Sequence, residues 1–346
     1  MSEPTIEQQS GRLWDYLKGF HAVHLVAMGS EAGLFAELAK AGGDGLAPVA
    51  LAGRLNLHPP YVEVWCRTAY SYGFLESEDG ARFRLGPHMD KLLVERGDPR
   101  YLAPYVATTV NHVADDLRRY PKHFRDGSMH RFQEHGADFS RHIGDTSAGF
   151  HNFIVKRMLP AVPGLKARLE AGGRVLDVGC GAGGLMLKIA QAWPKASCLG
   201  VDNDPHGVEQ AKKAIAASGL ADRVAVELVG GEGIRHRSEF DLVTMFEVIH
   251  EIAAEHRQAV MRNVGETLKP GGVFFAIDET YPSNLAELRD PGFGFAVQTQ
   301  FNEVVWGNIV PTREEQDRLF AIAGLVDVTR APVGGLFTLL TARKPV

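Results

Sequence analysis

The pattern of apolar and polar positions divides the chain into three parts, of which the first ends near residue 97. Apolar residues recur at helical spacing over Leu13–Met28. Three shorter helical segments follow, and then two runs that alternate apolar and polar residues on either side of a Glu-Asp-Gly turn. These segments are Glu31–Ala41, Pro48–Leu55, Pro60–Tyr72, Gly73–Glu76 and Ala81–Leu85. Helices followed by a hairpin predict a winged-helix domain over residues 1–97.

The other two parts differ sharply in pattern. Residues 98–165 are helical and hold six of the 14 histidines, so we expect a helical connector that helps to shape a substrate pocket. From about residue 166, short β-like runs alternate with helical ones, which predicts an α/β domain with a parallel, doubly wound sheet over residues 166–346. The β-like runs are Arg174–Val178, Ser197–Val201, Val224–Leu228, Phe240–Phe246, Val273–Asp278, Val326–Val328 and Leu336–Ala342.

Composition narrows the class of protein. Of the 346 residues, 45% are hydrophobic and 23% charged, as in a globular enzyme, and the net charge of −5 gives no electrostatic reason to bind nucleic acid or an anionic membrane. The start of the chain lacks the pattern of a signal peptide, and no apolar stretch approaches about 18 residues. Three scattered cysteines suggest reduced thiols. We therefore expect a cytoplasmic protein without a membrane partner.

A glycine-rich loop, Gly179–Gly184, joins the strand Arg174–Val178 to a helix. It fits the dinucleotide pattern GxGxxG and equally the pattern DxGxGxG, so by itself it is weak evidence. Asp177 places a carboxylate beside the loop, where it would repel a pyrophosphate but suit a ligand with an ammonium and a sulfonium group. Asp202, 19 residues after Gly183, ends the second strand and can bind ribose hydroxyls.

With these motifs, residues 166–346 resemble a class I S-adenosylmethionine-dependent methyltransferase with a Rossmann-like sheet. Five ordered motifs carry the resemblance: Asp177–Gly183, Asp202, Leu228–Glu232, Phe240–Val243 and the turn Leu268–Gly272. The resemblance implies S-adenosylmethionine as the cofactor. The residues that it implies as cofactor-binding are Asp177, Gly179, Cys180, Gly181, Gly183, Asp202, Asn203, Glu232 and Phe246.

His250 and Glu251 follow the fourth strand of this domain, where parallel strands face the ligand crevice. A histidine suits the removal of a proton from a hydroxyl nucleophile, and a carboxylate such as Glu247 or Glu251 could hold its ring in one tautomer. Together with the N-terminal domain, this position resembles the small-molecule O-methyltransferases that carry a winged-helix dimerisation domain, in which it is the general base. The sequence departs from that family's His-Asp-Trp, because Glu251-Ile252 follows His250. We therefore predict His250 and Glu251 as catalytic residues.

The acceptor is expected to be a small molecule, first of all a hydroxyl of an aromatic or polycyclic metabolite. The resemblance leaves open a nitrogen or carbon acceptor methylated by proximity alone, and a protein that has lost catalysis. Aromatic residues over residues 281–308 suit a flat substrate or simply pack the segment, and Asp278 and Glu279 are further pocket candidates. The histidines of residues 98–165 show no metal-ligand spacing, so no metal site is predicted.

Two functions from other classes compete with this reading. A winged helix often binds DNA, but the segment Pro60–Tyr72, where a recognition helix would lie, is aromatic and has one arginine. An NAD-dependent dehydrogenase would normally lack both Asp177 and the Leu268–Gly272 turn. The apolar faces of Leu13–Met28 and Pro60–Tyr72 instead predict a homodimer, with no nucleic-acid partner.

Overall fold

The computed structural model describes residues 3–346, which form two compact units. The first unit comprises the chain up to Ala114 together with Asp145–Phe150. The second comprises Asp115–Gly144 and His151–Val346. Residues 98–165, predicted as a connector, are thus shared between the two units.

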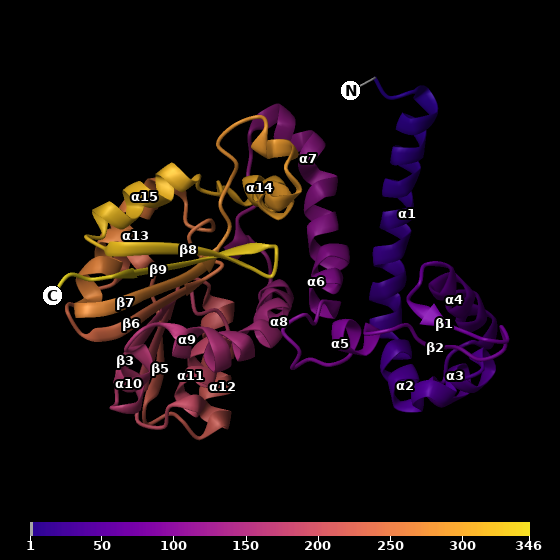
Figure 1. Ribbon diagram of the computed structural model, residues 1–346, viewed down its shortest axis with the longest axis horizontal. Coiled ribbons are helices and arrows are strands. Elements are labelled where there is room, and N and C mark those ends of the chain that lie inside the picture. Colours follow the sequence, from indigo (N-terminus) through magenta and orange to yellow (C-terminus); the bar gives the residue numbers. More distant parts are fainter. Residues whose placement is uncertain (1–2) are drawn as a thin grey trace. The chain divides into compact units, whose positions relative to one another are not determined.

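The first unit contains the helices and the hairpin in the predicted order (Figure 1). The long helix α1 begins at a capping box formed by Thr5 and Gln8, which satisfies backbone N–H groups at the helix start. Strands β1 and β2 pair antiparallel, Leu75 opposite Leu85, and a bridge from Leu46 to Phe83 extends the hairpin. The elements are α1 (Ile6–Glu31), α2 (Leu34–Ala41), α3 (Pro48–Leu55), α4 (Pro59–Ser71), β1 (Leu75–Glu76), β2 (Arg84–Leu85), α5 (Met89–Leu93) and α6 (Ala103–Thr108).

A core of apolar side chains holds these elements together. The Trp65 indole packs against the ring of Phe35 at a centroid distance of 5.1 Å, and its Nε1–H donates to the Leu25 carbonyl. In contrast, the N-terminal half of α1 keeps a row of large apolar side chains more than half exposed. No single helix in residues 3–346 is long and apolar enough to cross a membrane, and only α1 taken with the segment Leu34–Asp44, bent by 71°, meets the length and composition needed.

A seven-stranded sheet forms the centre of the second unit, in the order β5-β4-β3-β6-β7-β9-β8. Strands β3 to β7 are parallel, and β8 and β9 add an antiparallel edge. The strands are β3 (Arg174–Val178), β4 (Ser197–Asp202), β5 (Val224–Leu228), β6 (Phe240–Phe246), β7 (Leu268–Asp278), β8 (Val326–Val333) and β9 (Phe337–Arg343). The order reverses between β3 and β6, and in such sheets a ligand binds at the carboxyl ends of the strands beside this reversal. The predicted doubly wound α/β sheet is confirmed.

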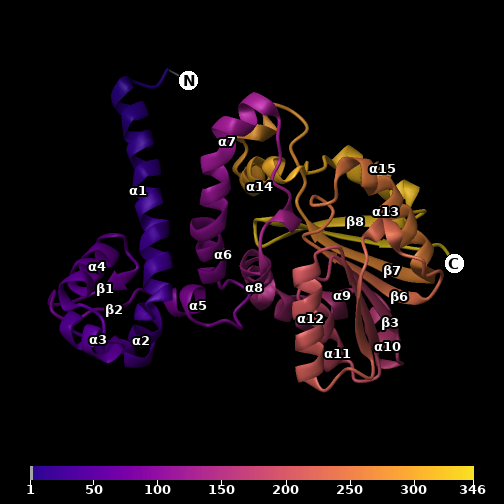
Figure 2. The ribbon, with the colours of Figure 1, turned by 180° about the vertical axis from the view of Figure 1, so that it is seen from behind.

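Helices cover both faces of this sheet, with α13 and α15 on one side and α11 and α12 on the other (Figures 1 and 2). A core of side chains such as Val243, Phe274 and Phe320 fills the space beneath α13 and α15. The remaining helices, of which α8 contributes Asp145–Phe150 to the first unit, are α7 (Ala114–Asp126), α8 (Ala137–Phe153), α9 (Leu159–Ala161), α10 (Leu165–Glu170), α11 (Gly184–Ala192), α12 (Pro205–Ser218), α13 (Ala254–Thr267), α14 (Gly294–Trp306) and α15 (Arg313–Ile322).

The segment Leu268–Gly272, expected as a turn before the fifth strand, is the first part of β7. Leu268 pairs with Phe240, the register then shifts, and Val273 pairs with Leu242. Gly271 adopts φ +69°, a left-handed conformation that glycine accepts without strain. The strand therefore continues through these glycines with a shift in register instead of beginning after them.

Helices α13 and α15 approach each other closely at Gly265, and this contact gives a test of the packing. A methyl group on Gly265 would overlap the carbonyl oxygen of Ala323, which is backbone and cannot rotate away. We expect Gly265→Ala to lower the free energy of unfolding by about 1–3 kcal/mol, which urea denaturation would measure. Gly294→Ala is the control, because no atom lies within 4 Å of its added methyl group. Equal stability of the two variants would contradict the packing described here.

Candidate active site

The glycine loop lies at the carboxyl end of β3, where the sheet order reverses. Gly179, Gly181 and Gly183 have φ values of +69°, +49° and +77°, so each adopts a conformation that other residues rarely accept. A Cβ on Gly179 would overlap the side chain of Val248, which follows β6. The loop is therefore bare backbone, and α11 begins directly after it at Gly184.

Two carboxylates flank this loop. Asp177 is buried, and its Oδ1 accepts a hydrogen bond of 2.6 Å from the Thr244 hydroxyl; burial raises the pKa of Asp177 to about 7. Asp202 ends β4, where its Oδ2 accepts from the Gly181 N–H at 2.7 Å and its Oδ1 from the Asp204 N–H at 2.8 Å. Asp202 thus braces the loop, and burial raises its pKa.

The other residues predicted to bind the cofactor differ in burial. Cys180 is buried in the loop, and Phe246 is half-buried at the end of β6. Asn203 is exposed, and its Oδ1 accepts from Gln133 Nε2 at 3.1 Å. Glu232 is exposed in a short 3-10 helix, Gly231–Gly233, which Asn263 on α13 anchors through two backbone carbonyls. The structure therefore brings the glycine loop, Asp202 and Phe246 to neighbouring strand ends, whereas Glu232 lies on the surface.

His250 lies in the loop after β6 and is 3% exposed. Its Nδ1 is 2.8 Å from Asp278 Oδ1 and 2.9 Å from Glu279 Oε2, both at the end of the adjacent strand β7. The second oxygen of Asp278 accepts hydrogen bonds from the backbone N–H groups of Val248 and Ile249. Asp278 consequently fixes both the imidazole and the loop that carries it, and any proton exchange with a substrate would use Nε2.

A buried arginine holds the same loop from the other side. Arg257, on α13, is 1% exposed, donates to the carbonyls of His250 and Ile252, and forms an ion pair with Glu315 at 2.8 Å. Because a buried guanidinium needs these acceptors, the loop conformation is tied to the packing of α13.

Carboxylates surround His250 on several sides. Burial alone would lower the pKa of His250, but the charges of Glu279 and Asp278 outweigh it and raise this pKa well above 6.5. Glu251 and Glu303 each place a carboxylate oxygen within 4.8 Å of a ring nitrogen of His250. Burial raises the pKa of Glu303 to about 7 and that of Glu251 well above its usual range. The charges of Glu279 and Asp278 therefore favour the protonated form of His250.

Several of these groups were not predicted from the sequence. Asp278 and Glu279 were named only as pocket candidates, and their contact with His250 comes from the pairing of β6 with β7. Glu303 reaches the site from α14, about fifty residues further along the chain, with no motif to mark it. Glu247 also lies here, at φ +58°, with its buried Oε1 lacking a hydrogen-bond partner in the described residues.

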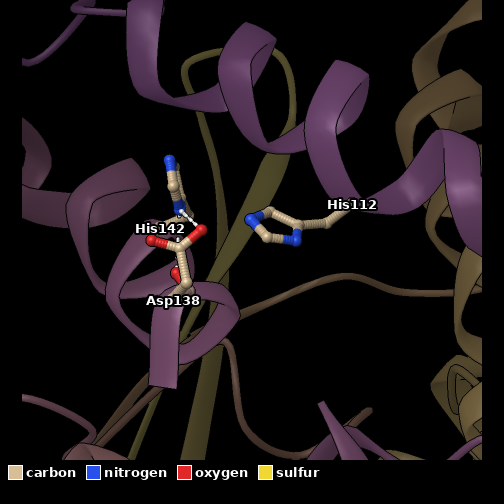
Figure 3. Close-up of side chains that lie close together, drawn as sticks. All are labelled: His112, Asp138 and His142. Atoms are coloured by element: carbon tan, nitrogen blue, oxygen red, sulfur yellow. Dashed lines mark hydrogen bonds and ion pairs between the residues drawn. The ribbon is translucent and has the colours of Figure 1, made fainter. Parts of the chain in front are cut away.

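Two histidines of residues 98–165 that belong to the second unit, His135 and His142, lie beside carboxylates. Figure 3 shows Asp138 and His142, one turn apart on α8, with His142 Nδ1 2.8 Å from the Asp138 carbonyl oxygen and 3.4 Å from its carboxylate. His135 Nε2 lies 2.9 Å from Asp116 Oδ2, which also accepts from Trp306 Nε1. His130 lies close to His135 and Asp116, so these three side chains could hold a metal ion. A protonated His135 would donate a hydrogen bond to the Asp116 carboxylate without a metal ion.

Comparison with known proteins shows which proteins this chain resembles. A methyltransferase-domain family model matches residues 176–274, which run from β3 into β7. An uncharacterised methyltransferase of Synechocystis is 34% identical over 116 residues, which cover 34% of this chain and 51% of that protein. The chain thus spans about half the length of this curated relative.

Solved structures extend the likeness to nearly the whole chain. Human N-acetylserotonin methyltransferase in complex with S-adenosylmethionine matches with a TM-score of 0.74 at 20% identity, covering 99% of this chain and 100% of that one. An O-methyltransferase family protein from Burkholderia thailandensis matches with a TM-score of 0.73 at 17% identity, covering 99% of each chain. Residues 176–274 therefore match a methyltransferase domain, and the chain has the overall fold of these solved methyltransferase structures.

Proposed function

We propose that this protein binds S-adenosylmethionine at the glycine loop and transfers its methyl group to a small molecule. The observation that carries the proposal is the arrangement at the ends of β3 and β4, where Asp202 braces a loop of bare backbone. A carboxylate so placed can also accept hydrogen bonds from ribose hydroxyls, as in other sheets of this kind. Asp177, whose pKa is raised to about 7 by burial, lies beside the loop, and a cationic ligand there would favour its ionised form.

The chemistry proposed is an in-line displacement. The acceptor attacks the methyl carbon, the bond from that carbon to sulfur breaks, and the sulfonium becomes the neutral thioether of S-adenosylhomocysteine. Alignment of acceptor and methyl group supplies most of the rate enhancement. For a hydroxyl acceptor, His250 Nε2 takes the proton while Asp278 and Glu279 stabilise the imidazolium that forms. A carboxylate oxygen of Glu251 also lies within 4.8 Å of a ring nitrogen of His250, where it could accept a hydrogen bond from the ring.

An aromatic acceptor is proposed because rings gather near the end of β6. The Phe246 and Phe337 centroids are 6.4 Å apart, and Phe295 meets Phe337 edge to face at 5.1 Å. Such rings favour a flat, apolar substrate. Two other aromatics of residues 281–308 serve packing instead, since Trp306 is buried against Phe139 and Phe301 contacts Tyr120.

One observation favours a second candidate, methyl transfer to nitrogen or carbon without a general base. The raised pKa of His250 favours the protonated ring, and a protonated ring cannot accept a proton. A nucleophile that reacts without such a proton transfer would need only to be held close to the methyl group.

The test of the proposal is a screen of phenols, quinones, aromatic amines and 2-oxo acids for release of S-adenosylhomocysteine, with the full-length protein and S-adenosylmethionine. Mass spectrometry of the product then identifies the methylated atom. We expect turnover with a hydroxylated aromatic. Turnover restricted to amines or activated carbons would replace the hydroxyl proposal by the second candidate, and binding of S-adenosylmethionine with no turnover across the panel would contradict the proposed substrate class.

A homodimer formed through α1 is also part of the proposal, as is a cytoplasmic location. Leu13, Tyr16, Leu17 and Phe20 form one stripe along α1, and each is at least 51% exposed in the single chain. We expect wild-type protein to have twice the 37.8 kDa mass of one chain by light scattering, and Leu17→Asp to shift it toward the monomer. The same change at Val49, exposed on α3, is the control. A monomeric wild type would refute the dimer.

A further inference from the structure

His151, on α8, is a buried side chain that the proposed reaction does not yet use. It is 8% exposed, and its Nδ1 is buried without a hydrogen-bond partner among residues 3–346. An unpartnered polar atom in the interior is costly, so natural structures usually supply a partner from the protein, water or a ligand. A ligand could supply the missing hydrogen-bond partner of His151 Nδ1.

The position of the ring indicates that group. A Cβ added to Gly184, the first residue of α11, would lie 3.0 Å from His151 Nδ1, so the nitrogen faces the start of that helix. The ring also meets Phe246 edge to face, with centroids 5.2 Å apart. His151 therefore bridges the end of the glycine loop and the end of β6, which are the two segments proposed to hold the cofactor.

The electrostatics at this point favour an anion. The first N–H groups of a helix lack intrahelical acceptors and carry partial positive charge, and α11 begins here. Lys188, one helical turn further along α11, donates to Asn152 at 2.8 Å, and its charge adds to the effect of burial in lowering the pKa of His151 to about 3. The ring is therefore neutral, and its Nδ1–H tautomer can donate to a carboxylate.

We propose that His151 binds the carboxylate of the amino-acid end of S-adenosylmethionine, together with the N-terminus of α11. This assignment rests on the proposed function. It divides the recognition of a zwitterion between two sides of the loop: Asp177 and Asp202 supply negative potential on the strand side, and His151 with α11 binds the carboxylate on the helix side.

The experiment compares two ligands by calorimetry. S-adenosylhomocysteine has the amino-acid end, whereas 5′-methylthioadenosine shares the nucleoside and thioether but lacks that end. His151→Phe should weaken S-adenosylhomocysteine by about 10-fold or more and leave 5′-methylthioadenosine within about 2-fold, because one hydrogen bond to a charged group is lost. His151→Gln, which keeps a donor, should recover most of the affinity. His256→Ala, at an exposed histidine of α13, is the control.

Each result decides the assignment. Wild-type affinity of His151→Phe for both ligands, or an equal loss for both, would overturn it, since the second pattern indicates a role in packing alone. Should His151→Phe fail to fold, the ratio of the two affinities is read from His151→Gln and His151→Ala, and an unchanged ratio in His151→Ala overturns the proposal. If wild-type protein binds neither ligand, the proposed function itself fails.

Discussion

Replacing His250 by glutamine should lower kcat for methylation of a hydroxyl acceptor by about 100-fold or more, with the affinity for S-adenosylhomocysteine nearly unchanged. A positioned general base contributes about 10²–10⁴-fold, and glutamine cannot take the proton. Single-turnover kinetics with the acceptor identified by the screen would measure the loss, and calorimetry would measure the affinity. His256→Gln should behave like wild type, because that histidine is exposed at the start of α13.

The pH dependence of kcat/KM tests whether His250 acts as a general base. Glu279 and Asp278 raise the pKa of His250 well above 6.5. Because only the neutral ring can accept a proton, kcat/KM should increase as the pH rises through this raised pKa. Asp278→Asn removes one of the charges that raise the pKa, so the midpoint of the profile should move to lower pH. A flat profile together with full activity of His250→Gln would contradict the catalytic role and favour methyl transfer by proximity.

Replacing Asp202 by alanine should weaken binding of S-adenosylhomocysteine by about 100-fold. The carboxylate accepts hydrogen bonds from the backbone of Gly181 and Asp204, and it is the group proposed to bind the ribose hydroxyls. Loss of two hydrogen bonds from the ribose hydroxyls to this charged carboxylate would cost about 3 kcal/mol or more of binding free energy. This cost corresponds to an increase in Kd of about 100-fold or more. Isothermal titration calorimetry would measure it.

The control for this change is Asp222→Ala, an exposed aspartate in the turn before β5. Both variants should show circular dichroism spectra like that of wild type, so that a loss of binding reflects the site. Unchanged affinity in Asp202→Ala would show that neither the brace on the loop nor the proposed ribose contact matters for binding.

The fold was largely predictable because the central parallel strands, such as β3 and β6, are mostly buried, whereas the edge strand β5 is largely exposed. Buried strands are continuous apolar runs bounded by polar turns, and β3, β5 and β6 begin and end at the predicted residues. The strand β7 was the exception. Its early glycines indicated a turn, but the pairing with β6 includes Leu268 and resumes at Val273, so the glycines lie at a register shift inside one strand.

The site was predictable only where a local motif marks it. The glycine loop and Asp202 are short-range patterns, and they lie together as expected. The charges that control His250 come from β7 and α14, and His151 approaches from α8. These contacts depend on strand pairing and helix packing between distant segments, so no local spacing in the sequence predicts them. Glu232 is marked by a motif and lies exposed after β5, so its role in binding the cofactor stays a prediction.

The most direct test of the central claim is calorimetric titration of the full-length protein with S-adenosylhomocysteine and, separately, with NAD. Asp177 and Asp202 flank a loop that could in principle cradle a pyrophosphate, so the two ligands distinguish the two readings of the same glycines. We predict one site per chain with micromolar affinity for S-adenosylhomocysteine and no heat of binding with NAD. Binding of NAD without binding of S-adenosylhomocysteine would contradict the account.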